Sequence, residues 1–263
     1  EYAGDMAEEF GAKIDTWITI NEPMSMLMGG YVAAFFPPGK SFQIESTMRG
    51  LFNIVYAHAA GYDAIHTRDL VDADGDGNNA LVSIAKNRPV MEAFDSTNEG
   101  DVESARRLEY IYNHLLLNGL AHGQVDLNAD EDYDDAGEGT FESLANKLDW
   151  IGINYYGRFI VRDSLTTMCD EMPCADGQGV VAPVAAEQNT DPARLYSDMA
   201  WELHPDGLAY VLEHAASFGV PLRITENGLA DNDDELRARF IVSHLKVVQD
   251  AIEAGTDIRG YYH

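Results

Sequence analysis

Cysteine is nearly absent from this sequence. Its two cysteines, Cys169 and Cys174, lie in one loop-like stretch, and two residues cannot build the disulfide framework of a small secreted fold. We expect two surface thiols, with a local disulfide or a shared metal as alternatives. No histidine lies nearby in the sequence to complete a zinc site. Long apolar runs are also missing: no stretch approaches the roughly 20 residues of a membrane span, and no basic-then-apolar signal opens the chain.

Lysine is scarce as well. The chain has 5 Lys and 12 Arg against 45 acidic residues, which gives a formal charge of −28. Nucleic acid and anionic membranes would repel such a protein, so we expect neither as a partner. An acid-rich, lysine-poor composition resembles that of proteins from salt-loving organisms, in which molar salt screens the self-repulsion; an acidic protein from an ordinary organism is the alternative. We expect a cytoplasmic protein.

A glycine-rich phosphate-binding turn, which would follow the first strand of a dinucleotide-binding sheet, is not found either. What the sequence does contain is 263 residues, 46% of them hydrophobic, which is enough for one large α/β domain or part of one. Apolar runs predict five strands, at 15–21, 80–86 (continuing to 90), 148–156, 222–226 and from 257 onward. Helical periodicity predicts helices at 1–12, 46–68, 102–120, 205–218 and 231–253. Ser46 or Thr47 is expected to cap the second of these helices, and Leu245 and Ile252 are among the residues expected to face inward on the last.

Strands that alternate with helices indicate a parallel sheet, because parallel neighbours need long crossovers. A doubly wound sheet and a (β/α)8 barrel both fit this pattern, and the missing phosphate turn favours the barrel. The helical pattern at the start suggests that the chain begins inside a domain. The last residues begin a strand and stop.

Two glutamates stand at the ends of similar strands. Glu22 follows Trp17-Ile-Thr-Ile-Asn21 and precedes a proline, and Glu226 follows Leu222-Arg-Ile-Thr and precedes Asn-Gly. The third predicted strand ends in Asn154-Tyr-Tyr156. In a barrel the carboxyl ends of all strands share one face, where active sites form. We therefore expect Glu22, Asn154, Tyr156 and Glu226 to meet there.

Other acidic and basic groups are interpreted as structural. Asp72-Ala-Asp-Gly-Asp76-Gly copies the first half of a calcium loop, but Ser83 stands where the loop's last ligand would be a glutamate. We expect an acidic turn, with weak calcium binding as the alternative. Residues 126–138 are expected to form a solvated surface, and His58 to be a hydrogen-bonded core histidine.

Several phrases together resemble glycoside hydrolase family 1, the β-glucosidase and β-galactosidase family. The main phrases are Thr19-Ile-Asn21-Glu22-Pro23, Asn154-Tyr155-Tyr156 and Ile224-Thr225-Glu226-Asn227-Gly228. The supporting phrases are Phe36-Pro-Pro-Gly39, Met199-Ala-Trp201-Glu202, Pro205-Asp-Gly207-Leu208 and Gly260-Tyr-Tyr-His263. The resemblance thus extends over the whole chain.

The resemblance implies a retaining exo-acting β-glycosidase. Glu22 would be the general acid/base and Glu226 the nucleophile, with carboxyl groups about 5–5.5 Å apart. Asn21 would bind the sugar 2-hydroxyl, Tyr156 would hold the nucleophile, and Asn154 would belong to the substrate-binding set. The partner is a small β-glucoside or β-galactoside, no metal or organic cofactor is implied, and the protein could form a homo-oligomer.

The family's barrel has eight strands, and residues 1–263 resemble its C-terminal portion, strands 4 to 7 and the start of strand 8, within a single catalytic domain. The resemblance does not cover the early strands of the family's barrel or the segment after its last strand. Those parts would carry much of the sugar-recognition shell. Two alternatives stay open: an endo-acting barrel glycosidase similar to a cellulase, and an inactive sugar-binding fragment.

Overall fold

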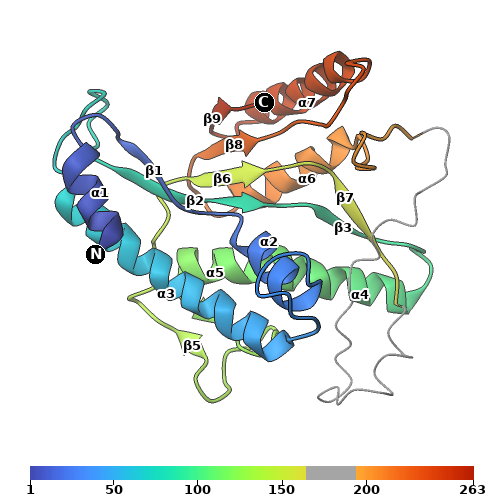
Figure 1. Cartoon of the computed structure of the whole chain (residues 1–263), viewed down its shortest axis with the longest axis horizontal. Coiled ribbons are helices and arrows are strands. Elements are labelled where there is room, and N and C mark those ends of the chain that lie inside the picture. Colours follow the sequence, from blue (N-terminus) through green and yellow to red (C-terminus); the bar gives the residue numbers. More distant parts are fainter. Residues whose placement is uncertain (164–193) are drawn as a thin grey trace.

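A five-stranded parallel sheet forms the centre of the molecule (Figure 1). Its strands lie side by side in chain order: β1 (Thr16–Asn21), β2 (Leu81–Asn87), β6 (Ile151–Asn154), β8 (Leu222–Glu226) and β9 (Ile258–Tyr261). The computed structural model describes residues 1–163 and 194–263, so the predictions for Cys169 and Cys174 lie outside the described residues. A doubly wound sheet reverses its strand order at a switch point, and this sheet does not. Its order is that of a partial (β/α)8 barrel.

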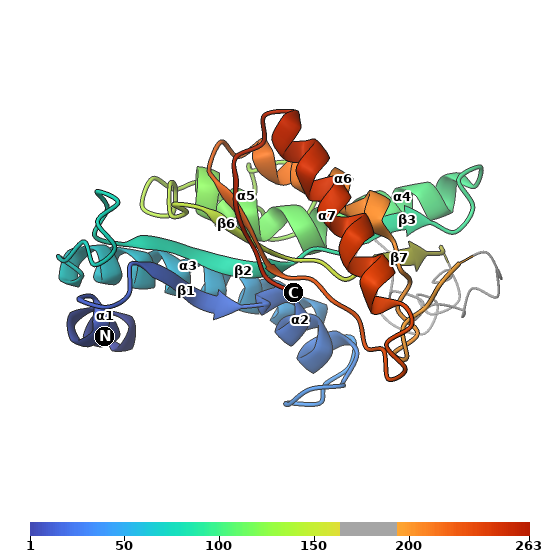
Figure 2. The ribbon, with the colours of Figure 1, turned by 90° about the horizontal axis from the view of Figure 1, so that it is seen from above.

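Helices connect these strands, and two minor sheets lie outside the main one. The helices are α1 (Tyr2–Phe10), α2 (Pro23–Leu27), the π-helix η1 (Met28–Val32), α3 (Ile44–Arg68), α4 (Glu99–Glu109), the π-helix η2 (Tyr110–His114), α5 (Leu115–His122), α6 (Pro205–Ala216) and α7 (Arg237–Glu253). The minor sheets pair β3 (Val90–Ala93) with β7 (Arg158–Val161), and β4 (Gln124–Val125) with β5 (Gly139–Thr140). Figure 2 shows α1 and α7 far apart, α1 beside α3 and α7 beside α6.

The core lies between the sheet and its helices. Leu51 of α3, Leu116 of α5 and Leu212 of α6 are fully buried in one cluster with apolar residues of β2, β6 and β8. On β1, Trp17 bonds to Asp69, the C-cap of α3, and Thr19 bonds to His58 of α3, so Ile18 points to the opposite face of the sheet. Ile18 is 45% exposed, which shows that the inner face of the sheet is open at this strand.

The helix at 44–68 begins earlier than predicted. Its N-cap is Gln43, and neither Ser46 nor Thr47 caps it. The Thr47 hydroxyl instead donates to the carbonyl of Gln43, 2.9 Å away, as a threonine inside a helix can. His58 on this helix is confirmed as a core histidine: it is fully buried, and its ring nitrogens contact Thr19 Oγ1 (2.5 Å) and the Lys147 carbonyl (2.7 Å). Burial lowers its pKa.

The predicted helix at 102–120 is a longer, interrupted element. It begins at Glu99, because the Asn98 side chain accepts hydrogen bonds from two backbone N–H groups of the first turn. The five residues of η2 then widen the helix before α5 continues to His122. Gly123, with φ of 74°, ends it in the left-handed conformation typical of a helix C-terminus.

Three other predicted boundaries are wrong. The second strand does not continue to Val90, because Pro89 offers no N–H for the ladder. The strand at 148–156 is reduced to Ile151–Asn154. The last helix begins at Arg237 and not within 231–234, although Asp231 still accepts from the N–H groups of Leu236 and Arg237. Two side chains predicted to face inward on this helix, Leu245 and Ile252, are 41% and 49% exposed, because α7 packs mainly against α6.

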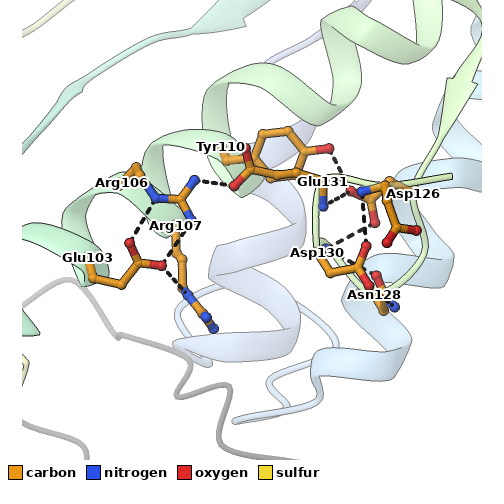
Figure 3. Close-up of polar contacts among 9 residues, drawn as sticks. Glu103, Arg106, Arg107, Tyr110, Asp126, Asn128, Asp130 and Glu131 are labelled. Atoms are coloured by element: carbon orange, nitrogen blue, oxygen red, sulfur yellow. Dashed lines mark hydrogen bonds and ion pairs between the residues drawn. The ribbon is translucent and has the colours of Figure 1, made fainter.

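The acid-rich loop at 126–138 is only partly the solvated surface that we expected. Asp126 is fully buried, and the loop folds around its carboxylate (Figure 3). Tyr110 of η2 donates to Oδ2 at 2.6 Å, and the backbone N–H groups of Ala129 and Glu131 donate to Oδ1 and Oδ2. Glu131 forms an ion pair with Arg106 of α4. With the N–H group of Asp130, which donates to Oδ1 at 3.3 Å, this buried carboxylate has four donors and anchors the loop to the helix behind it.

Candidate active site

The carboxyl ends of β1, β6 and β8 bring the predicted site residues to one edge of the sheet. Glu22 follows the last residue of β1, while Asn154 and Glu226 are the last residues of β6 and β8. Asn154 pairs with Glu226 in the register of these two parallel strands. The two glutamates therefore belong to the same edge, as the strand-end pattern predicts.

Glu22 has an unusual backbone conformation. Its φ and ψ angles of 46° and 54° lie in the left-handed region, which costs a non-glycine residue about 1 kcal/mol. The surroundings hold this conformation: the Glu22 N–H donates to the Ala85 carbonyl at 2.8 Å, and Pro23 begins α2 directly afterwards. The chain thus turns sharply at the strand end, with the carboxylate at the turn.

Asn154 connects the two strand ends that carry the glutamates. Its side chain is fully buried, and Nδ2 donates to Glu22 Oε1 at 2.9 Å and to Asn21 Oδ1 at 3.2 Å. Its Oδ1 accepts from the hydroxyl of Thr225 at 2.6 Å. Thr225 immediately precedes Glu226, so a short chain of hydrogen bonds joins the ends of β1, β6 and β8.

Tyr156 binds the second glutamate. Its hydroxyl donates to Glu226 Oε2 at 2.6 Å. Burial, the hydrogen bond to Glu226 and the negative charges of Glu226 and Glu22 all raise the pKa of Tyr156, so the phenol remains a donor. Tyr156 thus contacts Glu226 directly, and the charge of Glu22 also contributes to its raised pKa. The predicted separation of 5–5.5 Å stays a prediction.

Asn227 fixes the turn after Glu226. Its buried side chain donates to the Tyr155 carbonyl at 2.6 Å and accepts from the Tyr261 hydroxyl at 2.8 Å. The Tyr155 N–H in turn donates to the Glu226 carbonyl at 2.9 Å. The strand end that carries Glu226 is thus held from β6 on one side and from β9 on the other.

The sequence patterns missed a polar group at the end of β2. Asn87 Nδ2 lies 3.2 Å from Ser25 Oγ and 3.4 Å from the Tyr112 hydroxyl, and these two hydroxyls are 3.2 Å apart. Burial raises the pKa of Tyr112 to about 12. The strand-end rule that identified Asn154 applies equally to Asn87, so the signal was present.

Lys86 lies beneath this group. It is fully buried, its Nζ donates to the Asn87 carbonyl at 2.6 Å, and the ammonium lies 4.3 Å from the centre of the Tyr112 ring. Burial, followed by the positive charge of Arg88, lowers its pKa well below the usual value. A lysine one residue before the end of an apolar strand gives little indication of such a position.

Trp201 is a further residue to which the sequence assigned no role in the site. Its ring lies 5.2 Å from the ring of Tyr156 at an angle of 60°, and it is 44% exposed. Trp201 and Tyr156 line a small pocket together with Ser197, Glu202, Leu203, Gly228, Leu229 and Phe240. The phrase Met199-Ala-Trp201-Glu202 was its sequence signal. An exposed aromatic ring therefore stands beside the phenol that binds Glu226.

Two groups of carboxylates in the described part of the chain could hold a cation. They are Asp15, Asp72 and Asp74, and Asp126, Asp130 and Glu138, with the oxygens of each group within 4.8 Å of one another. In the first group the Asp72 carboxylate already accepts from the N–H groups of Gly75, Asp76 and Gly77, the acidic turn that we expected. Asp15 precedes β1, so this group lies at the opposite end of the strand from Glu22.

Among the described helices, none has the length and apolar character needed to cross a bilayer.

Comparisons with known proteins agree on one family. The family model described as glycosyl hydrolase family 1 matches residues 1–263. A β-galactosidase of Pyrococcus woesei is 32% identical over 274 residues, which cover 100% of this chain and 52% of the relative. A β-galactosidase of Saccharolobus solfataricus is 28% identical, with 100% and 49% covered.

The solved structures give the same result for the fold. The β-glycosidase of Thermosphaera aggregans superposes with a TM-score of 0.75 at 26% identity, covering 100% of this chain and 49% of that protein. The chain thus spans about half the length of the relatives that it matches.

Proposed function

As this chain belongs to glycosyl hydrolase family 1, we propose that it carries the catalytic carboxylate pair of a retaining exo-acting β-glycosidase. One observation supports the pair above all: Asn154 donates to Glu22, and Tyr156, two residues later, donates to Glu226. A single strand end thus contacts both glutamates. The β-galactosidases among its relatives favour a terminal β-linked sugar as the substrate.

In the first step, Glu226 attacks the anomeric carbon as the glycosidic bond breaks, and Glu22 gives its proton to the departing oxygen. A glycosyl ester of Glu226 and a free alcohol result. The Glu226 carboxylate must be ionised for this attack, and the Tyr156 hydroxyl stabilises that charge through its 2.6 Å hydrogen bond.

In the second step, Glu22, now ionised, takes a proton from water as the water oxygen attacks the anomeric carbon and displaces Glu226. Two inversions retain the β configuration. Asn21 is exposed and adjacent to Glu22, which suits the proposed contact with the sugar 2-hydroxyl. No step uses a metal or organic cofactor.

The nucleophile is tested with Glu226→Gly in the protein that carries the complete barrel, since these 263 residues span about half of the relatives' length. Hydrolysis of an aryl β-glucoside should fall at least about 10³-fold, because the covalent step is lost, and azide should restore turnover by entering the vacated space. Unchanged hydrolysis by Glu226→Gly would contradict the assignment.

Product analysis with the unmodified complete-barrel enzyme distinguishes exo from endo action. Release of a terminal monosaccharide as the first product from a cello-oligosaccharide supports the proposal, whereas internal cleavage favours the endo-acting alternative.

Two of the similar solved structures are β-glucosidase mutants, one derived from a hyperthermophilic tetrameric structure and one forming a dodecameric structure in its crystal form. A homo-oligomer is therefore proposed for the whole protein, and light scattering measures it.

A further inference from the structure

We infer that Asn154 is a positioning residue for the general acid: its amide, held by Thr225, orients the Glu22 carboxyl, and its burial and its partners within the protein keep it from binding sugar. The inference rests on the proposed function and changes the role of Asn154 from the substrate-binding one that the sequence suggested. It depends on three hydrogen bonds and on complete burial of the side chain.

The neighbours of Asn154 determine which way the amide points. Nδ2 faces two oxygens, Oε1 of Glu22 and Oδ1 of Asn21, and the amide oxygen faces the hydroxyl of Thr225. Turning the amide over would place its oxygen against the oxygen of Asn21. The Thr225 hydroxyl would then face an N–H group in place of its acceptor. The orientation with three satisfied bonds is therefore favoured.

Both N–H groups of this amide, and one of the two acceptor positions of its oxygen, have partners within the protein. The two hydrogens of Nδ2 match two acceptors, and Oδ1 has the Thr225 hydroxyl at 2.6 Å. Because the side chain is also 0% exposed, a sugar hydroxyl could reach it only by displacing one of these partners. Binding of substrate is left to exposed groups such as Asn21.

The contact has a chemical consequence for Glu22. Nδ2 engages Oε1, so the other carboxyl oxygen is the one left to exchange a proton with the leaving group or water. A general acid must lie within hydrogen-bond reach of the atom that it protonates, and a misplacement of about 1 Å lowers the rate substantially. The same amide engages Oδ1 of Asn21, which leaves Nδ2 of Asn21 to donate to the sugar.

Thr225 adds a link to the other catalytic strand. Its hydroxyl restrains Asn154 from β8, one residue before Glu226. The three bonds thus define the position of the acid relative to the strand that carries the nucleophile.

The test compares leaving groups in the complete-barrel enzyme, using Asn154→Asp and Thr225→Val. Asn154→Asp keeps the size and the acceptor for Thr225 but removes the N–H groups that face Glu22. Thr225→Val removes the hydroxyl at nearly constant shape. For each variant, kcat/KM is measured with a dinitrophenyl β-glucoside, which needs little protonation, and with an alkyl β-glucoside, which needs a full proton transfer.

We expect Asn154→Asp to lose about tenfold more activity on the alkyl than on the dinitrophenyl substrate, and Thr225→Val to show a smaller difference in the same direction. Thr225→Ser, which keeps the hydroxyl, should restore the parent ratio. Thr19→Val is the matched control, because Thr19 bonds His58 on the helix side of the sheet and should leave the ratio unchanged.

Glu22→Ala distinguishes a failure of the acid assignment for Glu22 from a failure of the positioning role of Asn154. If Glu22→Ala shows the leaving-group difference but Asn154→Asp and Thr225→Val lower both activities equally, Asn154 has only a structural role and the inference is wrong. If Glu22→Ala itself shows no difference, the acid assignment fails, and the role of Asn154 fails with it. Should Asn154→Asp not fold, the Thr225→Val and Thr225→Ser pair decides.

Discussion

His244 shows how burial controls the charge of a single side chain. It is fully buried on α7, its Nδ1 lies 2.9 Å from the Phe240 carbonyl, and its ring stacks on that of Phe240 at 3.8 Å. Burial, with smaller effects from the charges of His204 and His263, lowers its pKa to about 4. In the unfolded chain a histidine titrates near 6.5.

The first prediction concerns acid stability. Between pH 6.5 and 4 the unfolded state binds a proton at His244 that the folded state does not, so the free energy of unfolding should fall as the pH falls through this window. The full effect is about 3 kcal/mol. Urea unfolding of the parent and of His244→Asn at several pH values measures it. The variant should lose less stability than the parent between pH 6.5 and 4, and equal losses would contradict the prediction.

Individual residues were predicted from sequence where a simple rule applied to them. Glu22, Asn154 and Glu226 stand at strand ends, and the structure brings all three to one edge. The role of Asn154 could not be predicted, because a hydrogen bond to Thr225 depends on the register between β6 and β8. The burial of Asp126 could not be predicted either, because its hydrogen-bond donor Tyr110 lies 16 residues away on another element.

At the scale of elements, η2 and the loop after β4 depend on one another. The widened turn of η2 carries Tyr110, whose hydroxyl satisfies the buried Asp126 carboxylate around which the loop folds (Figure 3). A buried carboxylate that loses a donor costs about 1–3 kcal/mol.

The second prediction is that Tyr110→Phe lowers the free energy of unfolding by about 1–3 kcal/mol and exposes the loop to proteolysis. Chemical denaturation and limited digestion with a protease that cuts after acidic residues measure both effects. Tyr56→Phe is the control, because Tyr56 is 49% exposed on α3. Equal stability and equal digestion of the two variants would show that the Tyr110 hydroxyl does not anchor the loop.

Element positions followed from periodicity, whereas boundaries depended on single polar contacts. All five predicted strands of the main sheet are present. Ser46 and Thr47 looked like caps by residue type, but the chain is already helical there and Thr47 bonds backward to Gln43. The π-helix η2 was not predicted, because a single α-helical period was applied to the whole of residues 102–120.

At the scale of the whole molecule, the excess of negative charge is the main feature that affects stability. A net charge of −28 repels itself in the folded state, and the ion pairs of the described chain are mostly on exposed side chains, where each contributes about 0–1 kcal/mol. Added salt shortens the screening length from about 10 Å at 0.1 M to about 3 Å at 1 M.

The third prediction is that the unfolding temperature rises between 0.1 and 2 M KCl, because screening removes more repulsion than attraction. Thermal unfolding followed by circular dichroism measures it, with sucrose as an uncharged control for solvent exclusion. A constant or falling unfolding temperature in KCl would contradict the electrostatic argument. The salt-loving origin suggested by the composition stays a prediction.

The choice between a doubly wound sheet and a barrel required the three-dimensional structure. Alternation of strands and helices allowed a doubly wound sheet or a barrel; the missing phosphate turn favoured the barrel, and the spatial order of the strands decides for it. That order depends on which faces the crossover helices cover, which no short sequence segment encodes. At the sequence level, the resemblance to the family therefore identified the barrel more firmly than the pattern of strands and helices did.

The strand order has a consequence for synthesis. Each strand of the main sheet pairs with the one made before it, so a chain growing on the ribosome can add strands one at a time. The bond between Glu22 and Asn154 can form once Asn154 has been made. Thr225 and Glu226 emerge more than 70 residues later, so the nascent protein gains the restraint on its proton donor and the group that attacks the sugar in the same step.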